Sequence, residues 1–171
     1  MRIRTPVWLA LGMLVLHPSL FAAADEADAI VGQWLTEKGE ARFEIFKAKG
    51  KYNGKIVWLK EPTYPTSDTE AGKPVRDRKN PDKSKRDRPI VGSQLLSDFT
   101  YVGRNTWVNG TIYNAADGNT YKATLTLKSP DKLHVRGYVG ISLLGATTVW
   151  TRYEKPKESK DEETEQKEMK Q

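Results

Sequence analysis

Few residues in this chain have the types and spacing that enzyme chemistry requires. His134, the histidine outside the N-terminal segment, alternates with Arg136 and Tyr138 and should share one face with them. A lone histidine in such surroundings is usually a surface residue rather than a general base. The chain also lacks a Gly-x-Ser-x-Gly nucleophile motif, a histidine-rich cluster and a phosphate-binding glycine loop. Because most carboxylates fall in turns, in a long central loop or near the C-terminus, we predict that the protein is not an enzyme.

Metal and thiol chemistry are also weakly represented. Asp77, Asn80 and Asp82 supply oxygen ligands at short spacing, which is the ligand type that calcium prefers. The order Asp-x-x-Asn-Pro-Asp nevertheless lacks the glycine turn and the distal glutamate of an EF-hand loop. The sequence contains no cysteine, which excludes disulfides, thiolate metal sites, a cysteine nucleophile and a lipidated N-terminal cysteine. We therefore predict neither a metal ion nor another cofactor.

The most strongly basic segment runs from Lys73 to Arg88 and holds eight basic and three acidic residues. Nucleic-acid binding would favour aromatic side chains among these cations for base stacking, but none occurs between Val75 and Ser97. We therefore predict no nucleic-acid partner. Two interpretations stay open. The segment is either a solvated loop pinned by its own ion pairs, with Arg88 and Asp77 as the expected pair, or a surface for an anionic lipid or envelope polymer.

The N-terminal segment has the composition of an export signal. Residues 1–24 contain a basic start at Arg2 and Arg4, an apolar run of about eleven residues, and three alanines before Asp25. The run is too short to span a bilayer. We expect cleavage near Ala24 and a mature protein that lies in the periplasm or is secreted.

The C-terminal segment, residues 155–171, consists largely of Lys, Glu and other polar residues. Such a segment cannot bury enough apolar surface to offset its ordering entropy, so we predict a disordered, charged tail. Residues 25–154 then form one domain, which is long enough to bury a core.

The body of the chain shows the alternation of β-strands. Between residues 30 and 153 the apolar side chains recur with a period of two, and no apolar stripe of helical length occurs. Turn-forming segments such as EKGE, AKGK, NAADGN and KSPDK separate the strands and are typical of hairpins. The predicted strands are 31–36, 41–48, 51–59, 90–101, 106–113, 120–128, 132–140 and 147–153. Eight antiparallel strands with tight connections fit an all-β barrel or sandwich, with a long loop after the third strand.

The alternation also predicts a register for three strands. A loop at Ser129–Asp131 would pair Leu127 with Leu133 and Ala123 with Gly137, and would place Gly110 in the same row. A row of such small residues either leaves a hollow or admits a large ring from the opposite wall. Close packing is the usual state of protein interiors.

The ends of the predicted sheet carry a recognisable motif. A Gly-x-Trp at Gly32 and Trp34 falls on the first strand, and Arg152 falls on the last. This arrangement resembles the lipocalins and fatty-acid-binding proteins, in which the tryptophan closes the barrel floor and the basic residue packs over its ring. Such a cation–π contact contributes about 0.5–2 kcal/mol. The resemblance implies an eight-stranded antiparallel up-and-down barrel.

A closer resemblance covers residues 30–153. The fragments VGQW, YNGKIVWLKEP, NPD, RPIVGSQLL, GTIYNAADGNTYKATLTL, LHVRGYVG and TVWTR are similar, in this order, to the domain-of-unknown-function 2147 family. These are small exported bacterial proteins of lipocalin-like fold. The resemblance implies a fold and a compartment, but no reaction, ligand or catalytic residue.

A barrel of this kind predicts an interior site for a small apolar molecule such as a lipid or fatty acid, bound by a monomer. The expected lining residues are Trp58, Val108, Ile112, Tyr121, Leu125, Val135 and Val139. The alternative is that these side chains fill a dry core, and that the protein uses residues 73–88 on an anionic surface. Ile141, Leu143 and Leu144 lie in the last connection, where apolar side chains pack inward, guard an opening or contact lipid.

Overall fold

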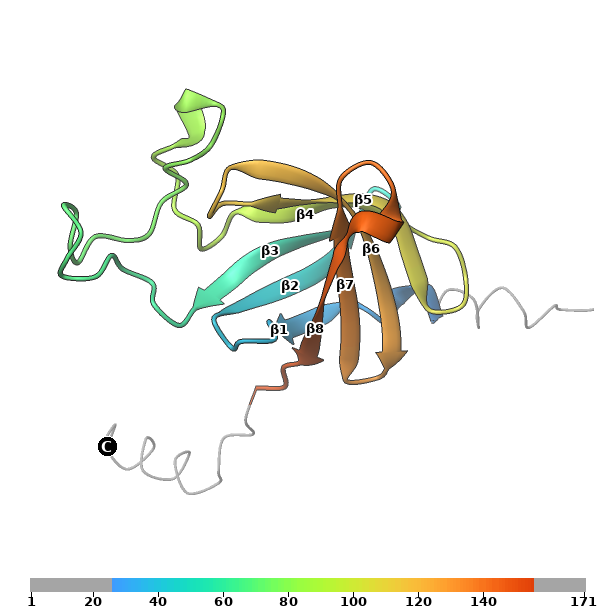
Figure 1. The fold of residues 1–171 in the computed structure, drawn as a ribbon. Helices are drawn as coiled ribbons and strands as arrows, with labels where there is room; N and C mark the ends of the chain where they lie inside the picture. The colour runs from blue at the N-terminus through green and yellow to red at the C-terminus, as the bar shows by residue number, and fades with distance from the viewer. Residues whose placement is uncertain (1–25, 156–171) are drawn as a thin grey trace, which may run out of the picture.

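Eight antiparallel strands close into one barrel, in which each strand pairs with the next and the last pairs with the first (Figure 1). The computed structural model describes residues 26–155, so the predicted signal peptide and all of the predicted tail except Lys155 lie outside the described residues. The strands are β1 (Gly32–Leu35), β2 (Ala41–Ala48), β3 (Lys51–Leu59), β4 (Gln94–Tyr101), β5 (Thr106–Asn114), β6 (Asn119–Ser129), β7 (Lys132–Tyr138) and β8 (Ala146–Arg152). The predicted all-β up-and-down barrel is confirmed.

Helical structure is confined to short turns in this part of the chain. Two 3₁₀ turns interrupt the connections, η1 (Lys83–Lys85) between β3 and β4 and η2 (Ser142–Leu144) between β7 and β8. Within residues 26–155, no helix has the length and apolar character needed to cross a membrane. The predicted strand 90–101 begins only at Gln94, and the predicted strand 132–140 ends at Tyr138.

The connections divide the barrel into two ends. Residues 26–31 and the turns at 49–50, 102–105 and 130–131 lie at one end, which we call the closed end. The longer connections 36–40, 60–93, 115–118 and 139–145 lie at the opposite end, which we call the open end.

The floor at the closed end rests on the predicted motif. The Trp34 side chain is fully buried, and its indole N–H donates a hydrogen bond of 2.8 Å to the carbonyl of Ile30. The Arg152 guanidinium lies 4.3 Å from the centre of the Trp34 ring. Its N–H groups donate to the carbonyls of Ala29, Val31 and Pro130. The predicted contact between Arg152 and the first-strand tryptophan is confirmed.

The predicted register of the central strands is also confirmed. Leu127 pairs with Leu133, and Ala123 pairs with both Gly110 and Gly137, so the row of small residues crosses three strands. The Phe99 ring of the adjacent strand β4 fills the space over Gly110, since a Cβ there would lie 2.3 Å from this ring. The layer next to the floor is therefore closely packed. Its fully buried side chains include Ile45, Leu96, Phe99, Trp107, Leu125 and Leu133.

Two β-bulges overturn predicted inward positions. The register of β5 and β6 shifts between Trp107 and Gly110, where Asn109 has φ 62°, so the buried Trp107 faces inward and Val108 faces outward. The register of β2 and β3 shifts after Arg42, which pairs with Trp58. The guanidinium of Arg42 lies 5.1 Å from the Trp58 ring, on the outer surface of the barrel. Val108 and Trp58 are therefore not interior residues.

The buried floor gives a stability prediction. Trp34→Ala should lower the free energy of unfolding by about 3–5 kcal/mol, because it removes a buried ring and the support of Arg152. Trp58→Ala is the matched control, and it should cost less than half as much because that ring is half-buried on the outer wall. Urea unfolding followed by circular dichroism measures both. Equal losses, or a loss below about 1 kcal/mol for Trp34→Ala, would contradict the assignment of the floor.

Candidate ligand-binding site at the open end

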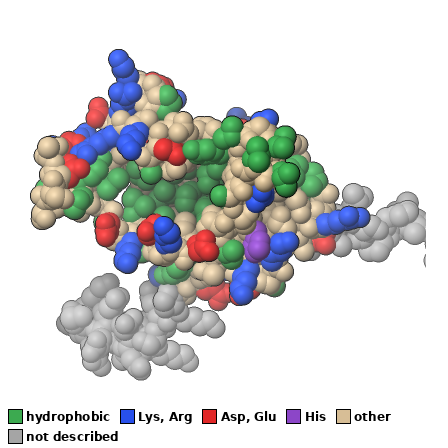
Figure 2. Space-filling view, in the orientation of Figure 1, with side chains coloured by type: hydrophobic (Ala, Val, Ile, Leu, Met, Phe, Trp, Pro, Cys, Tyr) green, Lys and Arg blue, Asp and Glu red, His purple; other side chains and the backbone are tan. Residues whose placement is uncertain are grey.

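A hollow enters the barrel from the open end. One cavity of about 440 Å³ lies between β5, β6, β7 and β8. Its lining residues are Ile112, Asn114, Tyr121, Val135, Gly137, Ala146, Thr147 and Thr148. A second cavity of about 500 Å³ shares Ile112, Asn114 and Thr148 with it and extends to the β1–β2 turn and the 60–93 connection. We call the two together the mouth cavity. Figure 2 shows hydrophobic side chains within a depression of this face.

Gly137, which carries no side chain, leaves part of this hollow open. A Cβ at Gly137 would lie 3.7 Å from Cγ2 of Ile112 and 3.9 Å from Cβ of Tyr121, which are ordinary contact distances. This position therefore has room for a side chain, whereas Gly110 at the other end of the row has none. The predicted hollow adjoins one end of the row. A ring fills the other end, but it comes from the adjacent strand β4 and not from the opposite wall.

Aromatic side chains form the opposite wall of the second cavity. Phe43 and Trp150 stack with their ring centroids 4.5 Å apart, and both line the cavity together with Ile56 and Leu95. None of these four residues is among the lining residues predicted from the sequence. The sequence does contain a signal for Trp150. It lies two residues before Arg152, which was predicted to pack on the floor, and residues two apart on a strand share a face.

Four of the seven predicted lining residues face the interior. Ile112, Tyr121 and Val135 line the mouth cavity, whereas Leu125 is buried in the packed layer beneath it. The predictions for Val108, Trp58 and Val139 are wrong. Val108 and Trp58 face outward. Val139 follows the last residue of β7 and is 70% exposed.

Polar groups ring the apolar lining. The Tyr121 hydroxyl donates a hydrogen bond of 2.8 Å to Asp117, and Asn114 donates another of 2.9 Å to the same carboxylate oxygen. The bond to Asp117 raises the pKa of Tyr121, and burial contributes further. Across the opening, the Thr148 hydroxyl donates to Glu37 at 2.9 Å. The mouth cavity thus combines an apolar interior with polar groups at its edge.

The 60–93 connection forms a wall beside the mouth cavity. Three of its segments lie side by side in a narrow ribbon of backbone. The N–H of Val75 donates to the carbonyl of Pro62, and the carbonyl of Val75 accepts from the N–H of Ile90. Ile90 is buried against the barrel core. A further cavity of about 560 Å³, lined by Val75 and Ile90 among others, shares Ile90 and Ala115 with the mouth cavity.

A buried carboxylate anchors this ribbon to the barrel. Asp77 is fully buried and accepts hydrogen bonds from Arg88 (2.8 Å), Asn80 (2.7 Å) and the Tyr113 hydroxyl on β5 (2.6 Å). The predicted pair of Arg88 and Asp77 is confirmed. Burial acts to raise the pKa of Asp77, but the combined effect of these three hydrogen bonds is larger. The pKa of Asp77 therefore lies below its ordinary value of 3.8. Burial, together with the bond to Asp77, raises the pKa of Tyr113 to about 12.

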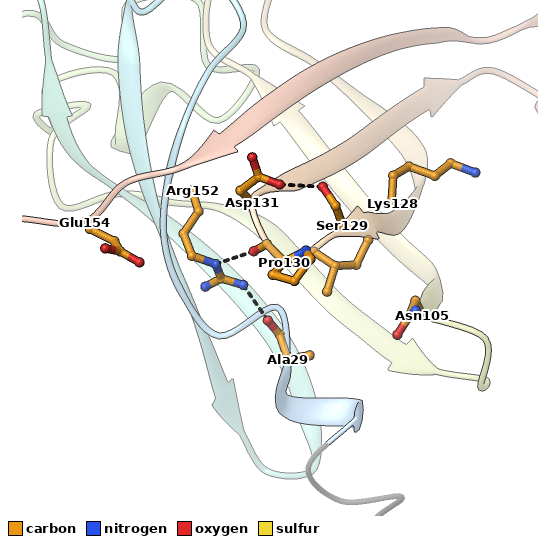
Figure 3. Close-up of a pocket in the computed structure, with 9 residues that line it drawn as sticks. Ala29, Asn105, Lys128, Ser129, Pro130, Asp131, Arg152 and Glu154 are labelled. Carbon is orange, nitrogen blue, oxygen red and sulfur yellow. Dashed lines mark hydrogen bonds between the residues drawn. The ribbon is translucent and has the colours of Figure 1, made fainter.

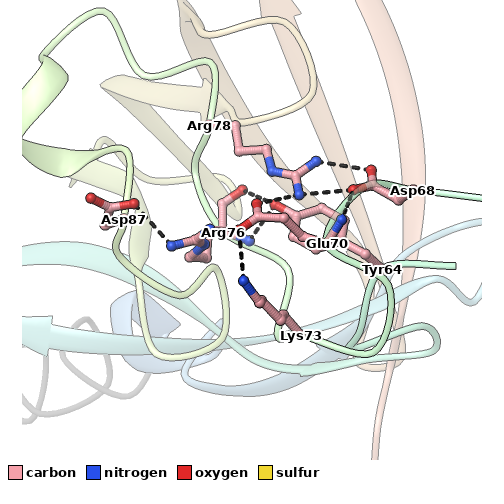
Figure 4. Close-up of polar contacts among 7 residues, drawn as sticks. All are labelled: Tyr64, Asp68, Glu70, Lys73, Arg76, Arg78 and Asp87. Atoms are coloured by element: carbon pink, nitrogen blue, oxygen red, sulfur yellow. Dashed lines mark hydrogen bonds and ion pairs between the residues drawn. The ribbon is translucent and has the colours of Figure 1, made fainter. Parts of the chain in front are cut away.

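Five of the eight cations of the basic segment form ion pairs with neighbouring acids, and Figure 4 shows those of Lys73, Arg76 and Arg78. Arg78 forms two hydrogen bonds of 2.9 Å with Asp68 and also contacts Glu70. Arg76 binds Glu70 and, at 2.9 Å, Asp87. The hydrogen bonds from these arginines lower the pKa values of Asp68 and Glu70 to about 2. The interpretation as a loop held by its own ion pairs is therefore confirmed.

A groove of about 940 Å³ also lies at the closed end (Figure 3). Arg152 is a prominent charged side chain there, but its guanidinium already donates to backbone carbonyls, including those of Ala29 and Pro130. Three N–H groups of Arg152 thus fasten the floor, and six of the nine residues that line the groove are polar or charged, so the groove has no apolar interior for a lipophilic ligand. We therefore place the candidate site at the open end.

The closed barrel, the Arg152–Trp34 floor and the apolar mouth define a lipocalin-like protein. Among solved structures, one similar to this chain is described as "Protein HP1028 from the human pathogen Helicobacter pylori belongs to the lipocalin family". The two share 25% sequence identity with a TM-score of 0.63, and the match covers 73% of this chain and 83% of that one.

A comparison with models of protein families shows the family of this chain. The family model described as "Uncharacterized protein conserved in bacteria (DUF2147)" matches residues 32–152, and the chain belongs to this family. The resemblance seen in the sequence is thus confirmed. No curated protein matches the chain.

The carboxylates of the 60–93 connection predict an acid-sensitive structure. Asp77, Asp68 and Glu70 have lowered pKa values, so the folded protein binds fewer protons than the unfolded chain and acidification favours unfolding. Their stabilising contribution should be complete above about pH 5 and should decline as the pH falls from about 4.5 to about 2. Urea unfolding at a series of pH values tests this decline.

Asp77→Asn provides the control for that experiment. The variant should be less stable than the wild type at pH 7, because an uncharged amide replaces the charged partner of Arg88. It should also lose less stability than the wild type on acidification. Parallel pH profiles for the two proteins would contradict the role of Asp77 as an ionised anchor.

Proposed function

We propose that the protein binds a small lipophilic molecule in the mouth cavity and carries it in the cell envelope. The observation that supports this proposal most directly is an apolar hollow above a closely packed floor, with Gly137 keeping the space open. Sites for small molecules usually have volumes of about 300–1,000 Å³ and a mainly apolar lining. The two cavities of the mouth each fall in this range.

The packing restricts the shape of the ligand. The layer formed by Phe99, Trp107 and Leu125 closes the lower part of the barrel, so a ligand reaches only the upper part. An apolar group would enter beside Ile112 and Val135, and a polar end would lie near the hydrogen-bonded groups of Tyr121 and Thr148. A compact molecule, or one end of a longer chain, therefore fits better than a fully enclosed long chain.

The envelope location is part of the same proposal. Residues 1–24 have the composition of an export signal, and the family to which the chain belongs is conserved in bacteria. An extracytoplasmic carrier also agrees with a sequence without cysteine, because such a protein has no thiol to oxidise. We expect the carrier to act as a monomer.

The alternative, an interaction protein with a filled core that uses residues 73–88 on an anionic surface, has less support. Half of the barrel is filled, but the upper part is hollow. Five of the basic residues in this segment already form ion pairs with neighbouring acids: Lys73, Arg76, Arg78, Lys85 and Arg88. These pairs reduce the charge available to an external partner.

A substitution at Gly137 tests the carrier proposal. Gly137→Val should narrow the hollow, since a Cβ at this position meets only ordinary contacts, and should weaken binding of the lipophilic fluorophore phenylnaphthylamine at least about tenfold. The free energy of unfolding should change by less than about 1 kcal/mol, because the Cβ meets only ordinary contacts and the side chain faces the cavity. Fluorescence titration and urea unfolding measure the two effects.

Gly110→Ala is the matched glycine control. Its Cβ would collide with the Phe99 ring, so it should destabilise the barrel while leaving the mouth cavity open and probe affinity unchanged at low temperature. Wild-type affinity in Gly137→Val, or no probe binding by the wild-type protein, would refute a ligand site in the mouth cavity.

A further inference from the structure

The connection between β7 and β8 carries an exposed apolar cluster beside the open end. Val139, Ile141, Leu143 and Leu144 are 70%, 61%, 82% and 76% exposed, and we call them the apolar tip. Figure 2 shows hydrophobic side chains grouped on this face. The side chains of the tip neither pack into the barrel nor seal its opening. Of the three roles that the sequence suggested for such residues, contact with lipid is the one compatible with this exposure.

Hydrogen bonds from one arginine side chain hold the backbone of the apolar tip in place. Arg136 on β7 donates hydrogen bonds of 2.8 and 2.6 Å to the carbonyl of Ser142, and it also donates to the carbonyl of Leu143 and the hydroxyl of Thr147. The η2 turn lies between these contacts. One arginine thus fastens the turn that projects Leu143 and Leu144 into solvent.

The charged side chains on the strands that carry the apolar tip are all basic, and the carboxylates at the opening, Asp117 and Glu37, lie on other connections. Residues 138–146 contain no charged side chain, and β6, β7 and β8 contain no Asp or Glu. Lys122 lies directly behind the tip, opposite Tyr138, and Arg136 lies two residues before Tyr138 on β7. Every contact of Arg136 described above is to an uncharged oxygen. Aliphatic side chains in front of uncompensated cations match the order of hydrocarbon and anionic headgroups at a lipid surface.

The apolar tip also adjoins the candidate site. Gly137, Ala146 and Thr147, which flank the β7–β8 connection, line the mouth cavity. A contact made by the tip would therefore bring the opening of the cavity next to the contacted surface. A lipid surface would be the natural place to collect or release a lipophilic ligand.

We propose that the apolar tip inserts into the interface of an anionic lipid membrane, with Lys122 and Arg136 at the level of the headgroups. The role in ligand exchange rests on the carrier function proposed above, but the membrane contact does not. A convex cluster of aliphatic side chains favours a fluid lipid surface over a second protein, which would need a complementary groove.

Vesicle sedimentation tests this proposal. The wild-type protein should bind vesicles that contain phosphatidylglycerol more tightly than vesicles of phosphatidylcholine alone, and the preference should shrink as salt is raised. Leu143→Ser combined with Leu144→Ser should weaken binding at least about tenfold, because both side chains are exposed and their loss removes the inserted surface. Lys122→Gln should weaken binding less and reduce its salt dependence.

Val102→Ser is the matched control, because Val102 is 59% exposed in a turn at the closed end. This variant should bind vesicles like the wild type. Vesicle binding that is absent, or that is unchanged in the Leu143/Leu144 double variant, overturns the proposal. A concentration-dependent dimer in sedimentation velocity that the double variant abolishes, without vesicle binding, would instead assign the tip to a second copy.

The two proposals can fail separately. The Leu143/Leu144 double variant should keep its affinity for phenylnaphthylamine in solution, because neither side chain lines the mouth cavity. Gly137→Val should keep its affinity for anionic vesicles, because it leaves the apolar tip unchanged. Loss of vesicle binding in Gly137→Val would contradict a membrane contact that is independent of the cavity.

Discussion

The contact between Arg152 and Trp34 holds the two ends of the barrel wall together. It sits where the first strand meets the last, and the same guanidinium ties down the segment that crosses the floor by bonding to its carbonyls. The bonds from Trp34 to Ile30 and from Trp107 to Ala27 complete this seal. The closely packed lower layer lies directly on this floor, and its thickness determines how deep the hollow above it can be. The position of the candidate site is thus a consequence of how the opposite end is closed.

The row of small residues across β5, β6 and β7 divides the interior into two parts. Gly110 on β5 contacts the ring of Phe99, whereas Gly137 on β7 faces open space, although both pair with Ala123 on the strand between them. The difference comes from the surrounding side chains, because the adjacent strand β4 places the Phe99 ring against Gly110, whereas no ring approaches Gly137 as closely. One barrel can therefore combine a stable core with a cavity, and the cavity lies at the end where the longer connections supply polar groups and an exposed apolar turn.

Much of this arrangement could be predicted from the sequence, because alternation along a strand fixes which face each residue occupies. The eight strands, the pairing of Ala123 with Gly137 and the inward positions of Ile112 and Val135 all follow from it. Val108 and Trp58 could not be placed in this way, because a single inserted residue reverses every later side chain on the strand. Asn109-Gly110 offered a local signal, since asparagine tolerates positive φ, but the shift near Trp58 has no such marker. In the second wall, Trp150 could have been placed by its alternation with Arg152, but its stacking on Phe43 is a contact between strands far apart in the sequence, which no local pattern specifies.

The seam between β1 and β8 has a consequence for the order in which the molecule assembles. Only two residue pairs join these strands, and Arg152 lies 123 positions from Ala29, which it binds. Bringing such distant segments together has a large entropic cost, because the long loop between them must close before the contact can form. The ring of strands can close only after the eighth strand is available, so a chain emerging gradually from a ribosome or a translocation channel would remain an open sheet until its last strand arrives.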